Sequence, residues 1–191
     1  MFSPLQYISR GRTAADQFSH ICTALDEGCR WIQLRFKNAP TADITGLAAK
    51  VRTRCAAYGA TLIINDHPLI ARIAEADGVH LDLNGMTAPE ALEIMGPGKI
   101  IGGTAHTLDD ILKRADEGCH YIALGPLRFM AAKEDPRPVL GIQGYHDILS
   151  CLVRRNVSIP IYAMGGILQE DVAGLMKAGV AGVAVSSLIV T

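Results

Sequence analysis

Two pairs of small residues near the end of the chain have the chemistry of a phosphate-binding site. The pair Gly165-Gly166 follows one apolar run, and the pair Ser186-Ser187 follows a second apolar run at Gly182–Val185. Glycine lets the backbone turn sharply and approach a ligand, while serine hydroxyls and the free N–H groups of a helix start bind anions. These four residues therefore predict a phosphate site built from two loops.

A second group of polar residues has the chemistry needed to hold a diphosphate. Gln33 and Arg35 lie two positions apart in an extended apolar run, so their side chains are expected to face the same side. Lys37 follows them, and Lys133 lies in the segment Leu127–Leu140, which has no clear periodicity. Arginine offers a planar fork of donors and lysine a point charge, so the three cations together fit a diphosphate. Simple solvent exposure is the alternative for each of them.

Asn65 and Asp66 directly follow the apolar run Thr61–Ile64 and precede an amphipathic segment. Asp66 is the candidate Mg²⁺ ligand, since this ion takes oxygen ligands, keeps several waters and bridges phosphates. An aspartate in front of a helix is also an ordinary N-cap. The residues alone leave metal binding and helix capping both open.

Thr104, His80 and His106 are three further polar residues at or near the ends of apolar runs. A histidine that contacts a substrate and a histidine satisfied by hydrogen bonds in the core or at its edge have the same sequence pattern. We include His106 among the predicted substrate contacts and leave both interpretations open for the two histidines.

These residues must be positioned by short apolar runs that alternate with amphipathic helical segments. The predicted strands are Leu5–Ile8, Trp31–Leu34, Thr61–Ile64, Val79–Leu81, Lys99–Gly102, Tyr121–Leu124 and the two runs that precede Gly165 and Ser186. The predicted helices are Thr13–Glu27, Asp43–Ala57, His67–Ala74, a helix that begins at Ala88, Leu108–Glu117, Gln143–Arg155 and Gln169–Ala178. Apolar residues recur at helical spacing in these segments, and glycines end several of them.

This alternation is typical of an α/β fold with parallel strands and helices outside them. Eight units predict a closed (β/α)8 TIM barrel, in which the carboxyl ends of all strands share one rim that hosts the active site. An open doubly wound sheet is the alternative, but no G-x-G-x-x-G follows the first strand. We expect residues 1–191 to form a single domain, with the last helix of the barrel missing because the chain stops just after the eighth strand.

The composition restricts the partners and the compartment. Of the 191 residues, 49% are hydrophobic and 19% are charged, and the formal net charge is −1, which gives no argument for nucleic acid or an anionic membrane as partner. We expect neither a membrane-spanning helix nor a signal peptide, because the sequence has no apolar run of about 18 residues and its first residues have no basic region. The five cysteines form no C-x-x-C pair, which argues against a disulfide framework or a zinc site. We expect a cytoplasmic protein with small phosphorylated substrates, and we leave a homo-oligomer open.

Seven motifs resemble, in order along the chain, those of one enzyme family. They are Trp31–Lys37, Leu62–Asp66, Ala76–Leu81, Ile101–Thr107, Tyr121–Pro126, Ala163–Ile167 and Gly182–Val185. The family is that of thiamine-phosphate synthase and its TenI-type relatives. The resemblance implies a (β/α)8 barrel that joins hydroxymethylpyrimidine diphosphate to thiazole phosphate, releasing diphosphate with Mg²⁺ as cofactor and passing through a pyrimidine cation.

The resemblance also implies roles for individual residues. The positions that match contacts to the pyrimidine diphosphate are Gln33, Arg35, Lys37 and Asn65. Asp66 matches one Mg²⁺ ligand, Thr104 replaces the usual serine near the reacting centre, and Lys133 matches the lysine that holds the diphosphate. The positions that match backbone contacts to the thiazole phosphate are Gly166, Ser186 and Ser187, next to Gly165.

Three departures from the family pattern affect the diphosphate side. Gly85 stands where the synthases carry the second Mg²⁺ ligand, and Asp82 lies three residues earlier. The segment Met130–Lys133 lacks the two threonines that the synthases carry there, and Phe36 replaces the usual glutamate. Loss of a carboxylate weakens the neutralisation of Mg²⁺, and each lost hydroxyl donor costs about 1–3 kcal/mol if it faced a charged diphosphate. We therefore expect a weakened metal site and reduced synthase activity.

The resemblance leaves two functions open. The first is a transferase of the thiamine-phosphate synthase type. The second is a TenI-like paralogue that binds or isomerises thiazole phosphate, although Pro126 stands in the loop where the tautomerases of that branch carry their catalytic histidine. Another phosphate-using barrel of amino-acid biosynthesis is a third alternative, and the Gln33/Arg35 and Asn65/Asp66 pairs argue against it.

Overall fold

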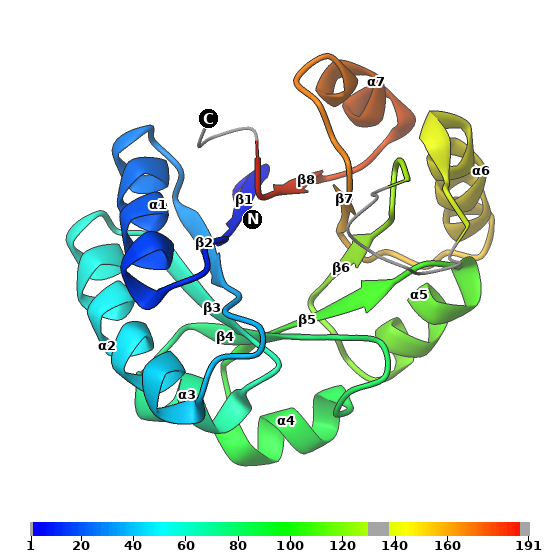
Figure 1. Ribbon diagram of the computed structural model, residues 1–191. Helices are drawn as coiled ribbons and strands as arrows, with labels where there is room; N and C mark the ends of the chain where they lie inside the picture. The colour runs from blue at the N-terminus through cyan, green and yellow to red at the C-terminus, as the bar shows by residue number, and fades with distance from the viewer. Residues whose placement is uncertain (1, 130–137, 188–191) are drawn as a thin grey trace.

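The chain folds as a closed barrel of eight parallel strands with helices on the outside (Figure 1). The computed structural model describes residues 2–129 and 138–187. The strands are β1 (Leu5–Ile8), β2 (Trp31–Leu34), β3 (Thr61–Asn65), β4 (Gly78–Leu81), β5 (Ile100–Ala105), β6 (Tyr121–Leu124), β7 (Ile161–Met164) and β8 (Gly182–Val185). They pair in sequence order, and β8 pairs with β1 through the registers Leu5–Val183 and Tyr7–Val185. The predicted barrel is confirmed, and the open-sheet alternative is wrong because both outer strands are paired.

Seven helices in the described residues connect these strands. They are α1 (Ala14–Asp26), α2 (Thr41–Ala57), α3 (Pro68–Ile73), α4 (Ala88–Met95), α5 (Leu108–Asp116), α6 (Gly141–Arg154) and α7 (Asp171–Ala178). Helices α1, α4 and α5 each begin with a capping box, in which a threonine and an acid three residues later accept one another's backbone N–H groups. These local signals explain why the three helices begin at the predicted residue or one residue later.

Strand β5 is longer than predicted. The sequence predicted the strand to end at Gly102. In the structure, β5 continues to Ala105, so Thr104 lies inside the strand. The glycines serve packing instead: a Cβ on Gly102 would lie 2.2 Å from Cζ of Tyr121, and one on Gly103 would lie 3.1 Å from the Arg114 side chain. Tyr121 and Arg114 occupy the space that side chains at these two positions would fill.

Two layers of side chains fill the barrel below its rim. At the amino ends of the strands, the rings of Trp31, Tyr121 and Tyr162 pack edge to face with centroids 4.8 to 5.8 Å apart, and Phe2 stacks on Trp31. The next layer toward the carboxyl ends contains buried polar residues: Gln6, Gln33, His80 and Thr104. Aromatic packing makes the floor apolar. The polar layer therefore lies between a dry floor and the open rim.

The ring of helices runs from α1 to α7 (Figure 1). Within the described residues, no helix follows β8, and residues 188–191 lie outside them. Helix α1 packs against α2, its neighbour in the ring. No helix among the described residues is long and apolar enough to cross a membrane. All five cysteines are free thiols, and three of them are buried.

Candidate active site

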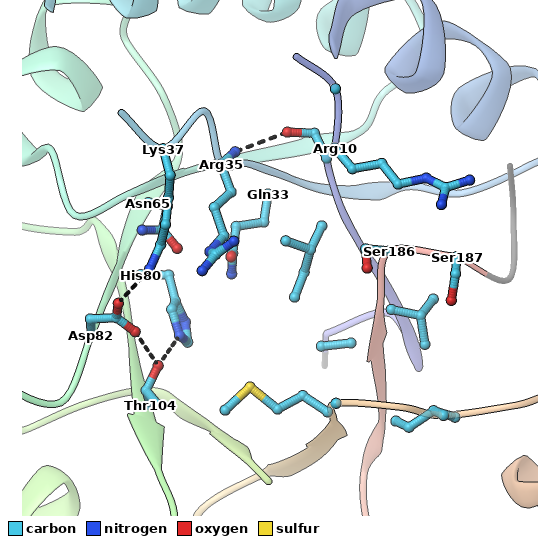
Figure 2. Close-up of a pocket in the computed structure, with 18 of the residues that line it drawn as sticks. Arg10, Gln33, Arg35, Lys37, Asn65, His80, Asp82, Thr104, Ser186 and Ser187 are labelled. Carbon is cyan, nitrogen blue, oxygen red and sulfur yellow. Dashed lines mark hydrogen bonds and ion pairs between the residues drawn. The ribbon is translucent and has the colours of Figure 1, made fainter. Parts of the chain in front are cut away.

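The carboxyl ends of the strands surround a pocket of about 380 Å³. Figure 2 shows its two sides, with Arg35, Lys37 and Asn65 on one and Ser186 and Ser187 on the other. Most of the predicted site residues line this pocket: Gln33, Arg35, Lys37, Asn65, Thr104, Gly165, Gly166, Ser186 and Ser187. The rim of the barrel thus brings together residues up to 154 positions apart in the chain (from Gln33 to Ser187), because parallel strands all end at the same edge.

Two contacts hold the cationic side of the pocket, one with a residue that follows β1 and one with a residue that follows β4. The backbone N–H of Arg35 donates to the Ser9 hydroxyl at 2.9 Å, which ties the ends of β2 and β1 together. Burial lowers the pKa of the Arg35 guanidinium, and the carboxylates of Asp82 and Asp66 oppose that shift. Lys37 Nζ lies 3.2 Å from Asp82 Oδ2. Arg35 is partly buried, whereas the Lys37 side chain is 46% exposed and pairs with a carboxylate that is also exposed.

Asp66 does not cap the following helix. Helix α3 has His67 at its N-cap position and no side-chain cap hydrogen bond. Asp66 adopts a left-handed backbone conformation, with φ of 58°, which aspartate tolerates better than most residues. Its Oδ1 accepts the Asp82 N–H at 2.7 Å, and its Oδ2 accepts from Asn65 Nδ2 at 2.5 Å. The capping alternative is therefore wrong. The Asp66 carboxylate lies beside Asn65 and Asp82, which line the pocket, but Asp66 itself is not among the lining residues.

The carboxylates of Asp66 and Asp82 influence each other. Burial raises the pKa of Asp66, and the negative charge of Asp82 raises it further. Burial acts in the same direction on Asp82, but the cations Lys37 and Arg35 and the neighbouring His80 keep the pKa of Asp82 below its ordinary value. Two adjacent carboxylates with different partners form an acceptor-rich corner next to the cations.

The chemistry of the donors in this corner determines whether it fits Mg²⁺. Among residues 2–129 and 138–187, no group of three or more His, Cys, Asp or Glu residues is placed to hold a metal ion. Mg²⁺, however, commonly uses one or two carboxylates together with waters and substrate phosphates. Asp66 and Asp82 supply two, and a Cβ on Gly85 would lie 3.9 Å from Asp66 Oδ1. The residues present fit a Mg²⁺ ion that depends on the substrate for further ligands.

The side of the pocket predicted to bind a phosphate, called the phosphate side below, is built largely from backbone. Gly165 and Gly166 have φ of 85° and 73°, a conformation that residues with a side chain rarely adopt. A Cβ on Gly165 would lie 2.8 Å from Pro126 Cβ, and one on Gly166 would lie 2.9 Å from Arg128 Cβ. Both positions therefore require glycine for two separate reasons, conformation and space.

Arg128 holds this glycine loop against helix α7. Its Nη1 donates to the Gly166 carbonyl at 3.0 Å, and its guanidinium forms a two-pronged ion pair with the buried carboxylate of Asp171 at the start of α7. Asp171 Oδ2 also accepts the Leu168 N–H at 2.7 Å. The side-chain hydrogen bond from Arg128 outweighs burial and keeps the pKa of Asp171 below its ordinary value. The ion pair fixes the loop that leads into the helix.

The remaining predicted residues have different positions. Thr104 and His80 belong to the buried polar layer and line the bottom of the pocket. There His80 Nε2 lies 3.0 Å from Thr104 Oγ1. The His106 ring is buried and its Nδ1 bonds the Gly125 carbonyl, away from the lining residues of this pocket. The geometry therefore gives no support to its predicted substrate contact. Lys133 lies outside the described residues.

Several residues of the pocket did not emerge as candidates from the sequence. Ser9, Arg10 and Gly11 follow β1 and line it, and so do Met164 and Ile167 around the glycine loop. The Arg10 side chain extends over the side that carries Ser186 and Ser187 (Figure 2). The signal for Ser9 and Arg10 was available, because they lie directly after the first strand. The apolar pocket residues gave no such signal, since they look like ordinary core positions.

Comparisons with known proteins place this chain in one group. A family model described as thiamine monophosphate synthase matches residues 6–189. Thiamine-phosphate synthase of Flavobacterium psychrophilum is 49% identical over 189 residues, which cover 99% of this chain and 92% of the relative. The synthase of Flavobacterium johnsoniae is 47% identical over 99% of this chain and 89% of the relative. A solved thiamine phosphate pyrophosphorylase from Pyrococcus furiosus superposes with a TM-score of 0.83 at 31% identity, covering 96% of this chain and 85% of that one.

Proposed function

We propose that this chain, which belongs to the thiamine monophosphate synthase family, is itself a thiamine-phosphate synthase. The proposed reaction joins hydroxymethylpyrimidine diphosphate to thiazole phosphate. The bond between the pyrimidine methylene carbon and the diphosphate oxygen breaks, and a bond forms from the same carbon to the thiazole nitrogen. Diphosphate leaves with the electron pair of the broken bond.

The observation that carries this proposal is the pocket with two opposed anion-binding sides. Arg35 and Lys37 on one side suit a diphosphate, because a guanidinium fork and an ammonium group both donate to phosphate oxygens. Gly166 and Ser187 on the other side suit a single phosphate held by backbone and hydroxyl groups. A transferase that joins one phosphorylated substrate to another needs both sides at once, facing one reacting centre.

The cationic side would favour the chemical step as well as binding. Negative charge grows on the diphosphate as its bond to carbon breaks, so donors fixed at that position stabilise the transition state more than the substrate. Arg35 is partly buried and anchored through its backbone to Ser9. Because Arg35 already lines the pocket, its guanidinium could stabilise the developing charge where it forms.

Mg²⁺ is the proposed cofactor, with Asp66 as its protein ligand and Asp82 as the carboxylate beside it. The ion would supply charge neutralisation for the departing diphosphate. The hydrogen bonds from Asn65 and from the Asp82 backbone leave each oxygen of Asp66 further acceptor capacity. Because position 85 is a glycine, we expect weaker Mg²⁺ binding than a site with a third carboxylate would give.

The test is an assay with both substrates and Mg²⁺, in which thiamine phosphate is detected by chromatography. We expect product at a rate that falls when Mg²⁺ is chelated, and a loss of at least two orders of magnitude in the variant Arg35→Ala. Lys50→Ala is the matched control, since Lys50 is an exposed cation on the outer helix α2. Absence of product at high enzyme concentration, together with binding of thiazole phosphate alone, would favour the TenI-like alternative.

A cytoplasmic location and small phosphorylated substrates are part of the same proposal. The five free cysteines, of which three are buried, suit a reducing compartment. Whether the chain forms a homo-oligomer is a separate prediction, and sedimentation of the purified protein across a range of concentrations measures it.

A further inference from the structure

Six polar side chains form a continuous line of hydrogen bonds through the barrel, from one wall to the other. In order along the line they are Gln33, Gln6, Tyr121, His80, Thr104 and Asp82. The first five come from five different strands, and all five are buried. Buried hydrogen bonds in such a line support each other, because each donor polarises the next. The direction in which the protons point decides what the line offers to a ligand.

The direction is fixed at the tyrosine end. Gln6 Nε2 lies 3.0 Å from the Tyr121 oxygen, and an amide nitrogen only donates, so the tyrosine oxygen accepts. The Gln6 carbonyl oxygen accepts from Gln33 at 3.4 Å, which fixes the orientation of the Gln6 amide. The tyrosine proton is then available for its other partner, His80 Nδ1 at 3.1 Å. When the tyrosine donates this proton, His80 Nδ1 is the acceptor and the ring carries its proton at Nε2.

The direction is fixed independently at the aspartate end. Asp82 is paired with Lys37 at 3.2 Å, so its carboxylate only accepts. The Thr104 hydroxyl, 3.3 Å from Asp82 Oδ1, donates its only proton there. His80 Nε2, 3.0 Å from the same hydroxyl, must then donate to it. The hydrogen bonds at both ends are consistent with the same histidine tautomer, with the ring proton at Nε2.

We propose that this one-way line makes Thr104 a pure hydrogen-bond acceptor toward the pocket and thereby selects a substrate that offers an N–H group there. The proposal rests on the proposed synthase function and assigns His80, Tyr121 and Gln6 as positioning residues for that contact. The Thr104 proton is directed to Asp82 and one lone pair accepts from His80. The second lone pair of the hydroxyl is what remains for a ligand, since Thr104 lines the pocket.

The chemistry of an aminopyrimidine fits this acceptor in only one way. The ring nitrogens and the phosphate oxygens of hydroxymethylpyrimidine diphosphate are acceptors, and its exocyclic amino group is its donor. An acceptor-only hydroxyl can therefore pair with the amino group alone. A 4-oxo analogue would point a carbonyl oxygen at the threonine lone pair, and a buried mismatch of two acceptors is costly. Discrimination against the oxo compound follows from the orientation of one proton.

The first experiment compares Tyr121→Phe with Tyr162→Phe, using the 4-amino and 4-oxo pyrimidine diphosphates as substrates. Tyr121 does not line the described pocket, so its hydroxyl acts on a substrate only through the line. Tyr162 belongs to the same aromatic cluster, but its hydroxyl donates to the Ser3 carbonyl at 3.1 Å, outside the line. We expect Tyr121→Phe to lower the preference for the amino substrate about tenfold through kcat/KM, and Tyr162→Phe to leave it unchanged. An equal effect of both, or of neither, would overturn the proposal.

The second experiment reads the tautomer directly in the wild-type protein. Long-range ¹⁵N–¹H correlation distinguishes protonated from unprotonated ring nitrogens, and the variant His80→Gln identifies the signals of His80. We expect a neutral ring with its proton at Nε2 throughout the neutral pH range. A proton at Nδ1 would reverse the line and refute the inference. This result does not depend on turnover. Absence of synthase activity would contradict the proposed function, whereas the spectrum tests the direction of the hydrogen bonds separately.

Discussion

The two sides of the pocket that we propose to bind anions are built in different ways. The phosphate side consists of glycines whose conformation and space exclude any side chain, with Arg128 and Asp171 bracing the loop from behind. The opposite side consists of charged side chains, Arg35, Lys37 and Asp82, that balance each other. A backbone site has a fixed shape and tolerates little substitution, whereas a charged site is adjustable in strength. Two departures from the family pattern lie near these charged residues: Phe36 is between Arg35 and Lys37 in the chain, and Gly85 is near Asp66.

Removal of Arg35 is expected to have the largest effect and to show that the charged side serves the chemical step. Arg35→Ala removes a planar fork from the developing charge, and we expect kcat/KM to fall about 10²–10³-fold. Arg35→Lys keeps the charge but loses the fork, so it should recover only part of that loss. Steady-state kinetics with each substrate varied in turn measures both. A loss seen only in KM would assign Arg35 to binding alone.

Gly166→Ala is expected to break the phosphate side. The new Cβ would clash with Arg128 Cβ at 2.9 Å and force a residue with φ of 73° into strain, so we expect KM for the thiazole phosphate to rise about 10–100-fold. Gly28→Ala is the matched control, since Gly28 also has positive φ, of 93°, but nothing lies within 4 Å of its Cβ position. The control should lower stability by about 1 kcal/mol and leave KM unchanged. Unchanged phosphate binding in Gly166→Ala would show that this loop is not the phosphate site.

His80, in the floor between the two sides, is expected to make the stability depend on pH. Its folded pKa of about 4 lies below the ordinary value of 6.5, so the unfolded chain binds a proton that the folded chain does not as pH falls through that interval. Stability is then complete above the unfolded pKa and decreases as pH falls, by about 2 kcal/mol between pH 7 and pH 5. Urea unfolding at the two pH values measures this difference. In His80→Gln, which cannot titrate, the same loss should be smaller by about that amount, and an unchanged pH dependence would contradict it.

Gly85→Asp tests the metal corner and has the smallest expected effect. Position 85 lies beside Asp66, so an added carboxylate should tighten Mg²⁺-dependent binding of diphosphate about tenfold. Calorimetric titration of diphosphate with and without Mg²⁺ measures the gain, and Asn84→Asp next to it controls for the added charge. If Gly85→Asp and its control behave alike, the local acid pair at Asp66 and Asp82 does not need a third carboxylate.

Much of the site was predictable from position along the chain. Residues directly after apolar runs were expected at one rim. Arg35, Asn65 and Ser186 line the pocket, whereas Asp66 and His106 are not among its lining residues. The same rule applied to the first strand would have added Ser9 and Arg10. It was less reliable for β5, because the predicted end at Gly102 lies inside the strand, where Gly102 and Gly103 pack against Tyr121 and Arg114. A glycine in a sequence can mark either a flexible turn or a close contact. Only its neighbours in the structure distinguish the two.

The sequence by itself determined the number of strands, their parallel order and the rim at which functional groups gather, because alternating periodicity is a local property of the chain. Only the tertiary structure decided which atoms meet: that Asp66 accepts the Asp82 N–H instead of capping a helix, and that Gln6, Tyr121 and His80 connect across the barrel to Thr104. Such contacts depend on how strands remote in sequence are staggered when the sheet closes. The spacing of residues within one segment gives no information about that stagger.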